Sequence, residues 1–221
     1  MLSVIRQLPK SHGDEYMKTI LAVGAHPDDI ELGCGGALCE NSSIGNRIIA
    51  VIVTKGEKRG NRDTRMCESR DALKLLGVNE VYFGDFPDTA IPNSHEVIEY
   101  LESYEVKYKP DIVYTHSINE THQDHRTIGW LSYSAFRNSL KVLSYESPRV
   151  TPSFHPTYFV DISNCINKKW EALKCHTSQQ NKRYVTYESI INLASFRGNQ
   201  VGVKAAEAFE VIKYVEKFDN D

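Results

Sequence analysis

The chain has 221 residues, of which 41% are hydrophobic and 25% are charged, a composition typical of one globular domain with a sizeable core. Its 26 basic and 29 acidic residues give a net charge of −3, which excludes the strong positive field that favours nucleic acid or an anionic membrane surface. No apolar run approaches the roughly 20 residues that a membrane-spanning helix needs. The composition therefore favours small-molecule chemistry.

Apolar runs of strand length recur along the first two thirds of the chain. Continuous hydrophobicity without alternation is typical of strands that are buried on both faces of a parallel sheet. The expected strands cover residues 19–24, 47–54, 80–84, 111–116 and 141–146. Because Met17 lies just before the first of them, we expect residues 1–16 to be an N-terminal extension and residues 17–217 to form a single domain.

Helical candidates lie between these runs. They cover residues 31–43, 64–76, 94–107 and 124–138. Because strand and helix alternate four times, the sequence predicts an α/β fold, a Rossmann-like and mostly parallel sheet flanked by helices. Ligands of such sheets bind at the carboxyl ends of the strands.

The pattern changes after Ser147. The segment "SPRVTPSFHPTYFV" carries three of the eight prolines and predicts an irregular connection into a short strand at residues 157–162. We expect residues 147–217 to be a C-terminal flank or lid of the same domain. Its predicted helices cover residues 163–176, 187–196 and 201–217.

The cysteines predict neither a zinc ribbon nor a secreted disulfide framework. They are odd in number, and none belongs to a Cys-x-x-Cys pair. The five are Cys34, Cys39, Cys67, Cys165 and Cys175. A reducing, cytoplasmic compartment is the simplest interpretation.

Ionisable residues crowd the end of the first expected strand, in "VGAHPDDIELGCGG" (residues 23–36). His26 and Asp29 are three positions apart, so one turn of chain can bring an imidazole and a carboxylate to the same ion. Pro27 restricts the backbone of this turn, and Asp28 is left free. The alternative is that an aspartate here serves only as the N-cap of the next helix.

A second cluster follows the fourth expected strand, in "NETHQDHRTIG" (residues 119–129). His122, Asp124 and His125 lie within four residues of one another. The first and fourth strands flank the point where strand order reverses in many doubly wound sheets, so the two loops are expected to face one crevice. Two histidines and one aspartate would then surround a divalent ion and leave a position for water, as in catalytic zinc sites.

The remaining residues of the two loops match the other needs of hydrolysis. Water activated by a metal needs a base, and an oxyanion needs a partner that later protonates the leaving group. Asp28 and His122 match these roles, and Asp124 is expected to hydrogen-bond His122 and keep it oriented and basic. The alternative of loop residues that hold no ion is disfavoured because the two clusters occur together.

The same residues carry a family resemblance. "AHPDDIELGCGG" and "THQDHR" resemble the signature motifs of the PIG-L/LmbE family, zinc-dependent de-N-acetylases of N-acetylglucosamine-containing compounds. The similarity extends through most of the chain. Further similar segments are "TKGEKRGNRDTRMCESRDALKLLGV" (54–78), "FGDFPDTAI" (83–91), "ALKCHTSQ" (172–179) and "FRGNQVGVKAAEAF" (196–209).

The resemblance implies roles for particular residues. It implies Zn²⁺, with Fe²⁺ or another divalent ion as alternatives, held by three ligands: His26, Asp29 and His125. It also implies Asp28 as the general base and His122, supported by Asp124, as the oxyanion-stabilising general acid. Arg65 matches an arginine that lies near the substrate in the family, with Arg62 and Arg59 as neighbouring alternatives, and Asp88 is a candidate for sugar-hydroxyl contact.

The leading hypothesis is a zinc hydrolase that removes acetyl from an N-acetylated amino sugar or its conjugate. Two alternatives stay open: an amidase that cleaves another amide in a sugar or thiol conjugate, and a non-catalytic zinc-binding protein on the same fold. The resemblance implies a homo-oligomer, a trimer or hexamer, and a small-molecule substrate rather than nucleic acid or a membrane.

Several residues receive no firm role from the sequence. Gly33, Gly35 and Gly36 do not have the spacing of a nucleotide-binding loop, and we expect them to let the loop and the helix start lie close to the metal turn. Cys34 is expected only to fill space. The others either line the site or merely pack around it: His116, His155, His176, Gln179 and Arg197.

Overall fold

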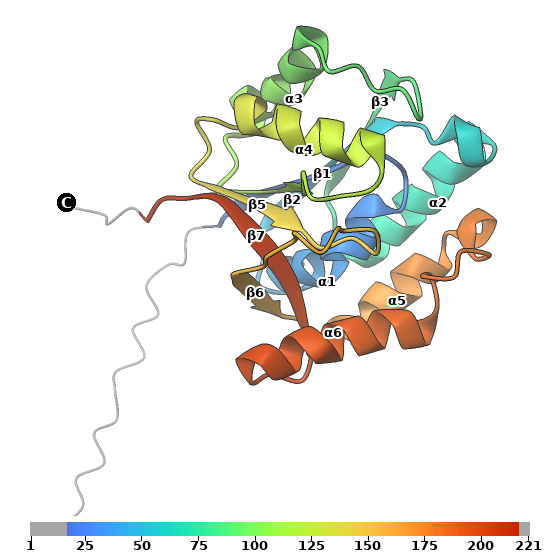
Figure 1. Cartoon of the computed structure of the whole chain (residues 1–221), viewed down its shortest axis with the longest axis vertical. Coiled ribbons are helices and arrows are strands. Elements are labelled where there is room, and N and C mark those ends of the chain that lie inside the picture. Colours follow the sequence, from blue (N-terminus) through green and yellow to red (C-terminus); the bar gives the residue numbers. More distant parts are fainter. Residues whose placement is uncertain (1–16, 217–221) are drawn as a thin grey trace, which may run out of the picture.

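The computed structural model describes residues 17–216, so the extension expected at residues 1–16 and the end of the chain from residue 217 lie outside the described residues. The structure confirms the predicted α/β fold: a single domain with a seven-stranded sheet between layers of helices (Figure 1). Within the described range no helix is long and apolar enough to cross a membrane.

The strand order of the sheet is β3-β2-β1-β4-β5-β7-β6, and β1 to β5 run parallel. The order reverses between β1 and β4, which places the switch point of the sheet at the ends of these two strands. The strands are β1 (Thr19–Gly24), β2 (Arg47–Thr54), β3 (Glu80–Phe86), β4 (Ile112–His116), β5 (Lys141–Tyr145), β6 (Tyr158–Asp161) and β7 (Ala206–Tyr214).

Helices cover both faces of the sheet. In Figure 1, α3 and α4 lie on one face and α1, α2 and α5 on the other, with α6 beyond them. The central strands are uniformly buried because each packs on helices from both sides. The helices are α1 (Asp29–Ser43), α2 (Arg62–Leu75), α3 (His95–Tyr108), α4 (Gln123–Ala135), α5 (Ile166–Lys174) and α6 (Tyr187–Val201), with two short 3-10 turns, η1 (Glu57–Arg59) and η2 (Thr177–Gln179).

The helix predicted over residues 201–217 is wrong, because residues 206–214 form strand β7. Its alanines, glutamates and lysines favour a helix, whereas the segment pairs antiparallel with both β5 and β6. Tertiary context decides here, since β7 covers the edge of β5 that would otherwise be exposed. The C-terminal flank thus completes the main sheet.

The expectation of reduced cysteines is wrong for one pair. Cys39 in α1 and Cys165, which directly precedes α5, form a disulfide that joins the two helices. The two positions are 126 residues apart and therefore carry no local spacing signal. Cys34, by contrast, is free and fully buried in the core below the sheet, where burial raises the pKa of its thiol.

The glycines of α1 serve helix packing. A side chain at Gly33 would overlap the ring of Tyr145, whose hydroxyl donates a hydrogen bond to the carbonyl of Val23 at 2.9 Å. One at Gly36 would overlap Ile162. The small residues therefore let α1 lie against β5 and the start of the C-terminal segment, which differs from the expected close approach to the metal turn.

Candidate metal centre and active site

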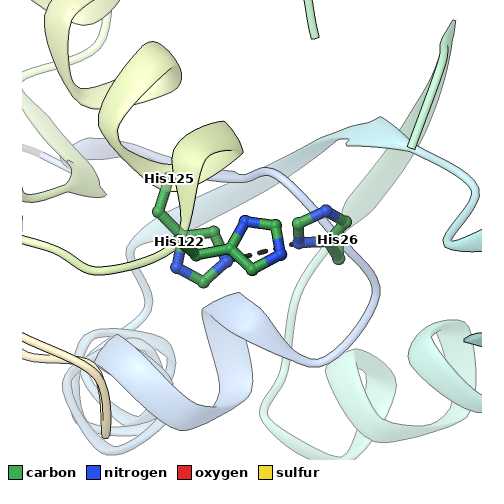
Figure 2. Close-up of side chains that lie close together, drawn as sticks. All are labelled: His26, His122 and His125. Atoms are coloured by element: carbon green, nitrogen blue, oxygen red, sulfur yellow. Dashed lines mark hydrogen bonds between the residues drawn. The ribbon is translucent and has the colours of Figure 1, made fainter. Parts of the chain in front are cut away.

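The two polar clusters meet at the switch point of the sheet. His26 lies in the loop after β1, Asp29 begins α1, and His125 lies in the first turn of α4, which follows β4. Figure 2 shows His122 and His125 on this turn facing His26 across the gap between the two loops. All three predicted ligands are nearly inaccessible, with exposures of 7%, 8% and 7% for His26, Asp29 and His125.

The polar atoms of the three predicted ligands lie close together, and Asp29 offers a different carboxylate oxygen to each histidine. Nδ1 of His26 lies 3.3 Å from Oδ2 of Asp29 and 3.3 Å from Nε2 of His125, and Nε2 of His125 lies 3.3 Å from Oδ1 of Asp29. Tetrahedral zinc with bonds of about 2.0–2.1 Å holds its ligand atoms about 3.3 Å apart. The donor set and its spacing therefore fit a zinc-like divalent ion.

Charge in this centre favours a cation. Burial lowers the pKa of His26, but hydrogen bonds to Asp124, Asp29 and Asp88 outweigh it and raise that pKa well above its usual value. Burial raises the pKa of Asp29, yet the neighbouring His125 and His116 bring it well below the usual range. The carboxylates thus stay ionised and present negative charge to the point where the three ligand atoms converge.

Carboxylates also hold the far side of both ligand imidazoles. Nε2 of His26 lies 3.0 Å from Oδ2 of Asp124 and 3.1 Å from Oδ1 of Asp88, so Nδ1 is the nitrogen that faces the other two ligands. Nδ1 of His125 lies 3.3 Å from Oε2 of Glu120, and its Nε2 faces His26 and Asp29. This carboxylate–histidine arrangement is typical of metal-binding histidines.

Asp124 therefore has a different partner from the one expected. Its carboxylate holds His26 and accepts hydrogen bonds from the backbone of Thr89 at 2.7 Å and Ile91 at 3.3 Å. The contact between Asp124 and His122 runs the other way, since the backbone N–H of Asp124 donates to Nδ1 of His122 at 3.2 Å. His122 caps α4, and its Nε2 is left to carry the proton.

His122 is expected to be neutral rather than protonated. Burial lowers its pKa, as do the nearby His125 and His26, despite the opposing charge of Asp124. A neutral ring with Nδ1 as acceptor presents an Nε2–H donor. The expected oxyanion-stabilising role is compatible with this form, since a neutral N–H donor still polarises a carbonyl.

Glu120 is a site residue whose role the sequence does not predict. It is 2% exposed, contacts His125, and accepts a hydrogen bond from the hydroxyl of Ser147. Burial raises its pKa, but hydrogen bonds from His125 and Ser147 lower it to about 2. Its place in "NETHQDH", five residues before His125, was the available signal.

His116, the last residue of β4, lies next to the predicted ligand Asp29. Its Nε2 accepts a hydrogen bond from the backbone N–H of Ala25 at 3.0 Å and lies 3.1 Å from Oδ2 of Asp29. Burial and the neighbouring His125 lower its pKa to about 4, so the ring is neutral and its accepting nitrogen is already used. Asp29, His116 and His125 are close enough to hold an ion, but this hydrogen bond makes His116 the poorer ligand.

Asp28, the predicted base, lies beside the ligands and between two cations. Its Oδ2 accepts a hydrogen bond from Nζ of Lys182 at 2.6 Å, and its Oδ1 lies 3.4 Å from Nη2 of Arg65. The backbone of Asp28 has φ 109°, a conformation that L-residues rarely adopt. A non-glycine residue held in this way is typical of functional turns.

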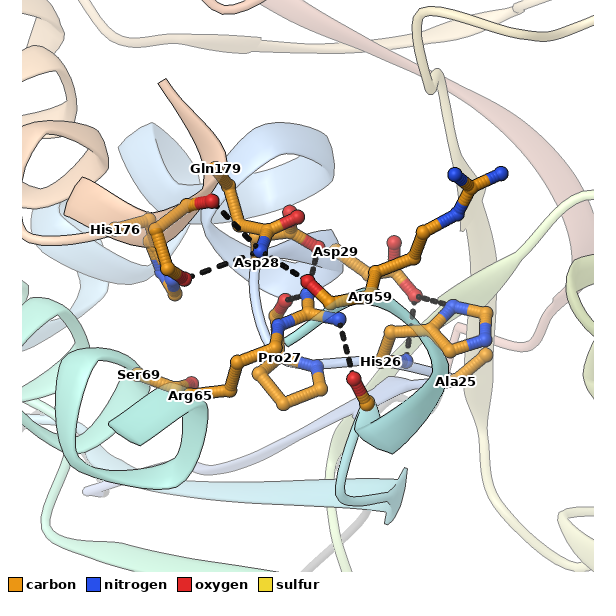
Figure 3. A network of polar contacts seen from close by, with 12 residues as sticks. Ala25, His26, Pro27, Asp28, Asp29, Arg59, Arg65, Ser69, His176 and Gln179 are labelled. Atoms are coloured by element: carbon orange, nitrogen blue, oxygen red, sulfur yellow. Dashed lines mark hydrogen bonds and ion pairs between the residues drawn. The ribbon is translucent and has the colours of Figure 1, made fainter. Parts of the chain in front are cut away.

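Arg65 and Asp88, the predicted substrate contacts, line the cleft but are each 2% exposed. Arg65 donates to the carbonyls of Pro27 and Gly56, and so connects the loops after β1 and β2 (Figure 3). Asp88 contacts His26 and accepts the backbone N–H of Lys58 at 2.9 Å. Both side chains are thus engaged in holding the site.

The C-terminal motifs contact the helices and loops that carry the site. His176 binds the fully buried Glu31 at 2.9 Å, and Gln179 donates to the backbone carbonyl of Arg59 at 2.9 Å (Figure 3). Nε and Nη2 of Arg197 donate hydrogen bonds to the two carboxylate oxygens of Glu146. The exposed His155 is not among the residues that line the cleft.

The centre opens into a cleft of about 730 Å³, large enough for a small sugar conjugate. Its floor holds the ligands and Asp28. Its walls come from the loops after β2, β3, β4 and β5 and from the η2–α6 loop. The lining residues are His26, Asp28, Asp29, Leu32, Arg59, Arg65, Asp88, Thr89, His122, Gln123, His125, Ser147, Pro148, Arg149, Ser178, Gln179, Asn181, Lys182, Arg183 and Tyr184.

Comparison with known proteins places this arrangement in a family. Residues 21–136 match the family described as GlcNAc-PI de-N-acetylase, PIG-L. The chain is 39% identical over 170 residues to the uncharacterized deacetylase YaiS of Escherichia coli K12, covering 73% of this chain and 91% of that protein. The chain therefore belongs to the PIG-L family, and the predicted resemblance is confirmed.

Two further relatives differ in their named reactions. The structure of N,N'-diacetylchitobiose deacetylase from Pyrococcus horikoshii superimposes with a TM-score of 0.79 at 26% identity, over 88% of this chain and 84% of that one. The 4-oxalmesaconate hydratase of Pseudomonas putida is 24% identical over 225 residues, covering 86% of this chain and 84% of that protein.

Proposed function

We propose that this protein is a metal-dependent hydrolase that removes the acetyl group from an N-acetylated amino sugar or its conjugate. The observation that carries the proposal is the approach of the His26 and His125 rings to each other and to the two carboxylate oxygens of Asp29, each at 3.3 Å, with Asp28 beside them. The deacetylase names of two relatives support the reaction class.

The residues of this chain divide the chemistry among them. A divalent ion held by His26, Asp29 and His125 would supply Lewis acidity toward the acetyl carbonyl and lower the pKa of a bound water. Asp28 accepts the proton of the attacking water, and its contacts with Lys182 and Arg65 fix the orientation of its carboxylate.

His122 acts on the other side of the scissile bond. Its Nε2–H donates to the developing oxyanion, because its Nδ1 is held by the N–H of Asp124. The proton needed by the departing amine is passed on from Asp28, the group that accepted it from water. The products are acetate and a free amino sugar.

The test measures acetate and primary amine from protein loaded with Zn²⁺ or Fe²⁺, using simple N-acetylglucosaminides. Both products are expected in equal amounts. Asp28→Ala should keep its metal and lose about 10²–10⁴-fold in kcat, whereas His125→Ala should lose the metal. Metal loss in Asp28→Ala would contradict the assignment of roles.

The same assay separates the alternatives. An amidase acting on another amide yields an amine but no acetate, so product masses distinguish it. A non-catalytic metal-binding protein yields neither product while still retaining metal. The intact Asp28, which such a protein would not need, disfavours that alternative.

A second candidate is a hydratase that adds water to an unsaturated carboxylate. The observations that favour it are the hydratase relative and the exposed arginines that line the cleft, Arg59, Arg149 and Arg183. Loss of absorbance of an unsaturated dicarboxylate, without acetate release from any N-acetyl sugar, would select it over the deacetylase.

A further inference from the structure

Cationic side chains gather at the cleft from three separate parts of the chain. Arg59 ends η1, Arg149 lies in the connection between β5 and β6, and Lys182 and Arg183 lie in the loop between η2 and α6. Lys182 is already committed to Asp28. The three arginines are exposed and remain available to a ligand.

These three arginines differ from most others in the described part of the chain. Elsewhere guanidinium groups meet carboxylates or carbonyls, as in the pairs of Arg47 with Glu80 and Arg137 with Glu102. Four described arginines have no such acceptor for the guanidinium: Arg59, Arg70, Arg149 and Arg183. Only Arg70 of these lies outside the cleft, and it stacks on Phe83.

Figure 3 shows the contrast for one of them. The backbone carbonyl of Arg59 accepts a hydrogen bond from Gln179, while its guanidinium extends away from the network without a partner among the drawn residues. Arg149 is comparable, since its guanidinium lies 5.6 Å from the centre of the Tyr184 ring. A planar guanidinium next to an aromatic ring retains its donors for a carboxylate or phosphate.

No acidic side chain of the cleft competes for these cations. The lining carboxylates are those of Asp28, Asp29 and Asp88, which are 4%, 8% and 2% exposed and engaged on the cleft floor. Arg59, Arg149 and Arg183 thus form a cationic rim of the cleft. Because the chain carries a net charge of −3, this rim is a local feature and does not follow from a basic composition. Arginines concentrated in this way attract and orient an anion.

We propose that the substrate bears an anionic group, a carboxylate or a phosphate, in its anomeric substituent, and that Arg59, Arg149 and Arg183 receive it. This inference rests on the proposed deacetylase function. The acetamide would sit between His122 and Asp28 on the floor, and the rest of the conjugate would extend toward the rim. A neutral oligosaccharide would leave the three arginines unused.

The experiment compares three glycosides of N-acetylglucosamine that differ only in the anomeric substituent: the neutral methyl glycoside, the carboxymethyl glycoside and the 1-phosphate. Acetate release by the metal-loaded wild type is expected to show kcat/KM at least about tenfold higher for an anionic substrate, as a charge-assisted hydrogen bond can provide. The carboxylate and phosphate arms identify which anion is preferred.

Variants test whether the preference for an anionic substrate depends on the arginines of the rim. Arg149→Ala and Arg183→Ala should each reduce kcat/KM for the preferred anion about tenfold, mainly through KM, and change the methyl glycoside less than about threefold. Arg70→Ala is the matched control, an exposed arginine without an acceptor away from the cleft, and should change neither. Raising ionic strength should weaken the preference for the anion, because exposed charges are screened.

Calorimetry measures the binding of the same three sugars: the 1-phosphate, the carboxymethyl glycoside and the methyl glycoside. This measurement tests the anion site separately from the deacetylase function. Tighter binding of an anionic sugar that depends on Arg149 and Arg183, without acetate release, would reject the deacetylase and retain the anion site. Equal kcat/KM for all three glycosides, or equal effects of the rim variants on all three, would overturn the anion site while leaving the deacetylase intact.

Discussion

The ammonium group of Lys182 lies 2.6 Å from Oδ2 of Asp28, although 154 residues separate them in sequence. Burial lowers the pKa of Lys182, but the charge of Asp28 and its hydrogen bond raise it above the usual value. Lys182 therefore stays protonated at the working pH and connects the η2–α6 loop to the predicted base.

Replacing Lys182 by methionine is expected to reduce kcat about tenfold or more, because Asp28 loses the group that fixes its orientation. Lys182→Arg should restore part of the rate, since it keeps the charge. Bound metal, measured by elemental analysis, should match the wild type in both variants. A methionine variant with unchanged kcat would show that Arg65 alone suffices to position Asp28.

The positive φ of Asp28 gives a prediction about stability. Asp28→Ala and Asp28→Gly both remove the contacts with Lys182 and Arg65, so both should be inactive and less stable than the wild type. Glycine accepts φ 109° without strain. The glycine variant should therefore be about 1 kcal/mol more stable than the alanine variant in urea unfolding. Equal stabilities would mean that the turn relaxes once its side-chain contacts are lost.

The carboxylates behind the ligand histidines should control metal affinity. Glu120→Gln removes the charge beside His125, and Asp124→Asn removes the one beside His26. Each change should weaken zinc binding about 10- to 100-fold, measured by competition with a chromophoric chelator. Glu96→Gln, at an exposed position on α3, is the control and should bind zinc like the wild type. Unaltered affinity in both site variants would argue against this centre as the metal site.

The sequence predicts the centre better than its surroundings, for a physical reason. His26 and Asp29 are near neighbours, and the two parallel strands β1 and β4 bring His125 to the same edge. Residues that act through long-range contacts leave no such pattern. Lys182 gave no signal, since 154 residues separate it from Asp28 and tertiary packing alone brings the two together.

The sequence also could not predict the direction of individual side chains. Asp124 is two residues from His122 and was expected to bind it, yet the first turn of α4 directs the carboxylate to His26. In β7, helix-favouring residues form a strand because β5 and β6 offer pairing partners on both sides. Local preference could not reveal either outcome, since both depend on neighbours distant in sequence.

Gly33→Ala should destabilise the domain. The added methyl group would overlap the ring of Tyr145, which is 1% exposed and cannot move without breaking its hydrogen bond to Val23. We expect a loss of about 1–3 kcal/mol in urea unfolding, as found for overpacked cores. Gly35→Ala in the same helix has its tightest contact, 3.2 Å, with Cδ1 of Leu76 and should cost less. A larger loss at Gly35 than at Gly33 would contradict this account of the packing.

The pH dependence of stability should reveal the cluster around Glu80. Hydrogen bonds from Tyr82, Tyr108 and Arg47 lower the pKa of Glu80 from 4.5 to about 2 in the folded protein. Because the folded pKa is the lower one, the stabilisation is fully present above pH 4.5 and is lost as pH falls toward 2. Glu80→Gln should therefore be less stable than the wild type at pH 7, and the difference should shrink as pH falls below 4.5. Urea unfolding at stepped pH measures this difference, with Glu96→Gln as the exposed control. A difference that stays constant as the pH falls from 4.5 toward 2 would mean that Glu80 acts by packing rather than by charge.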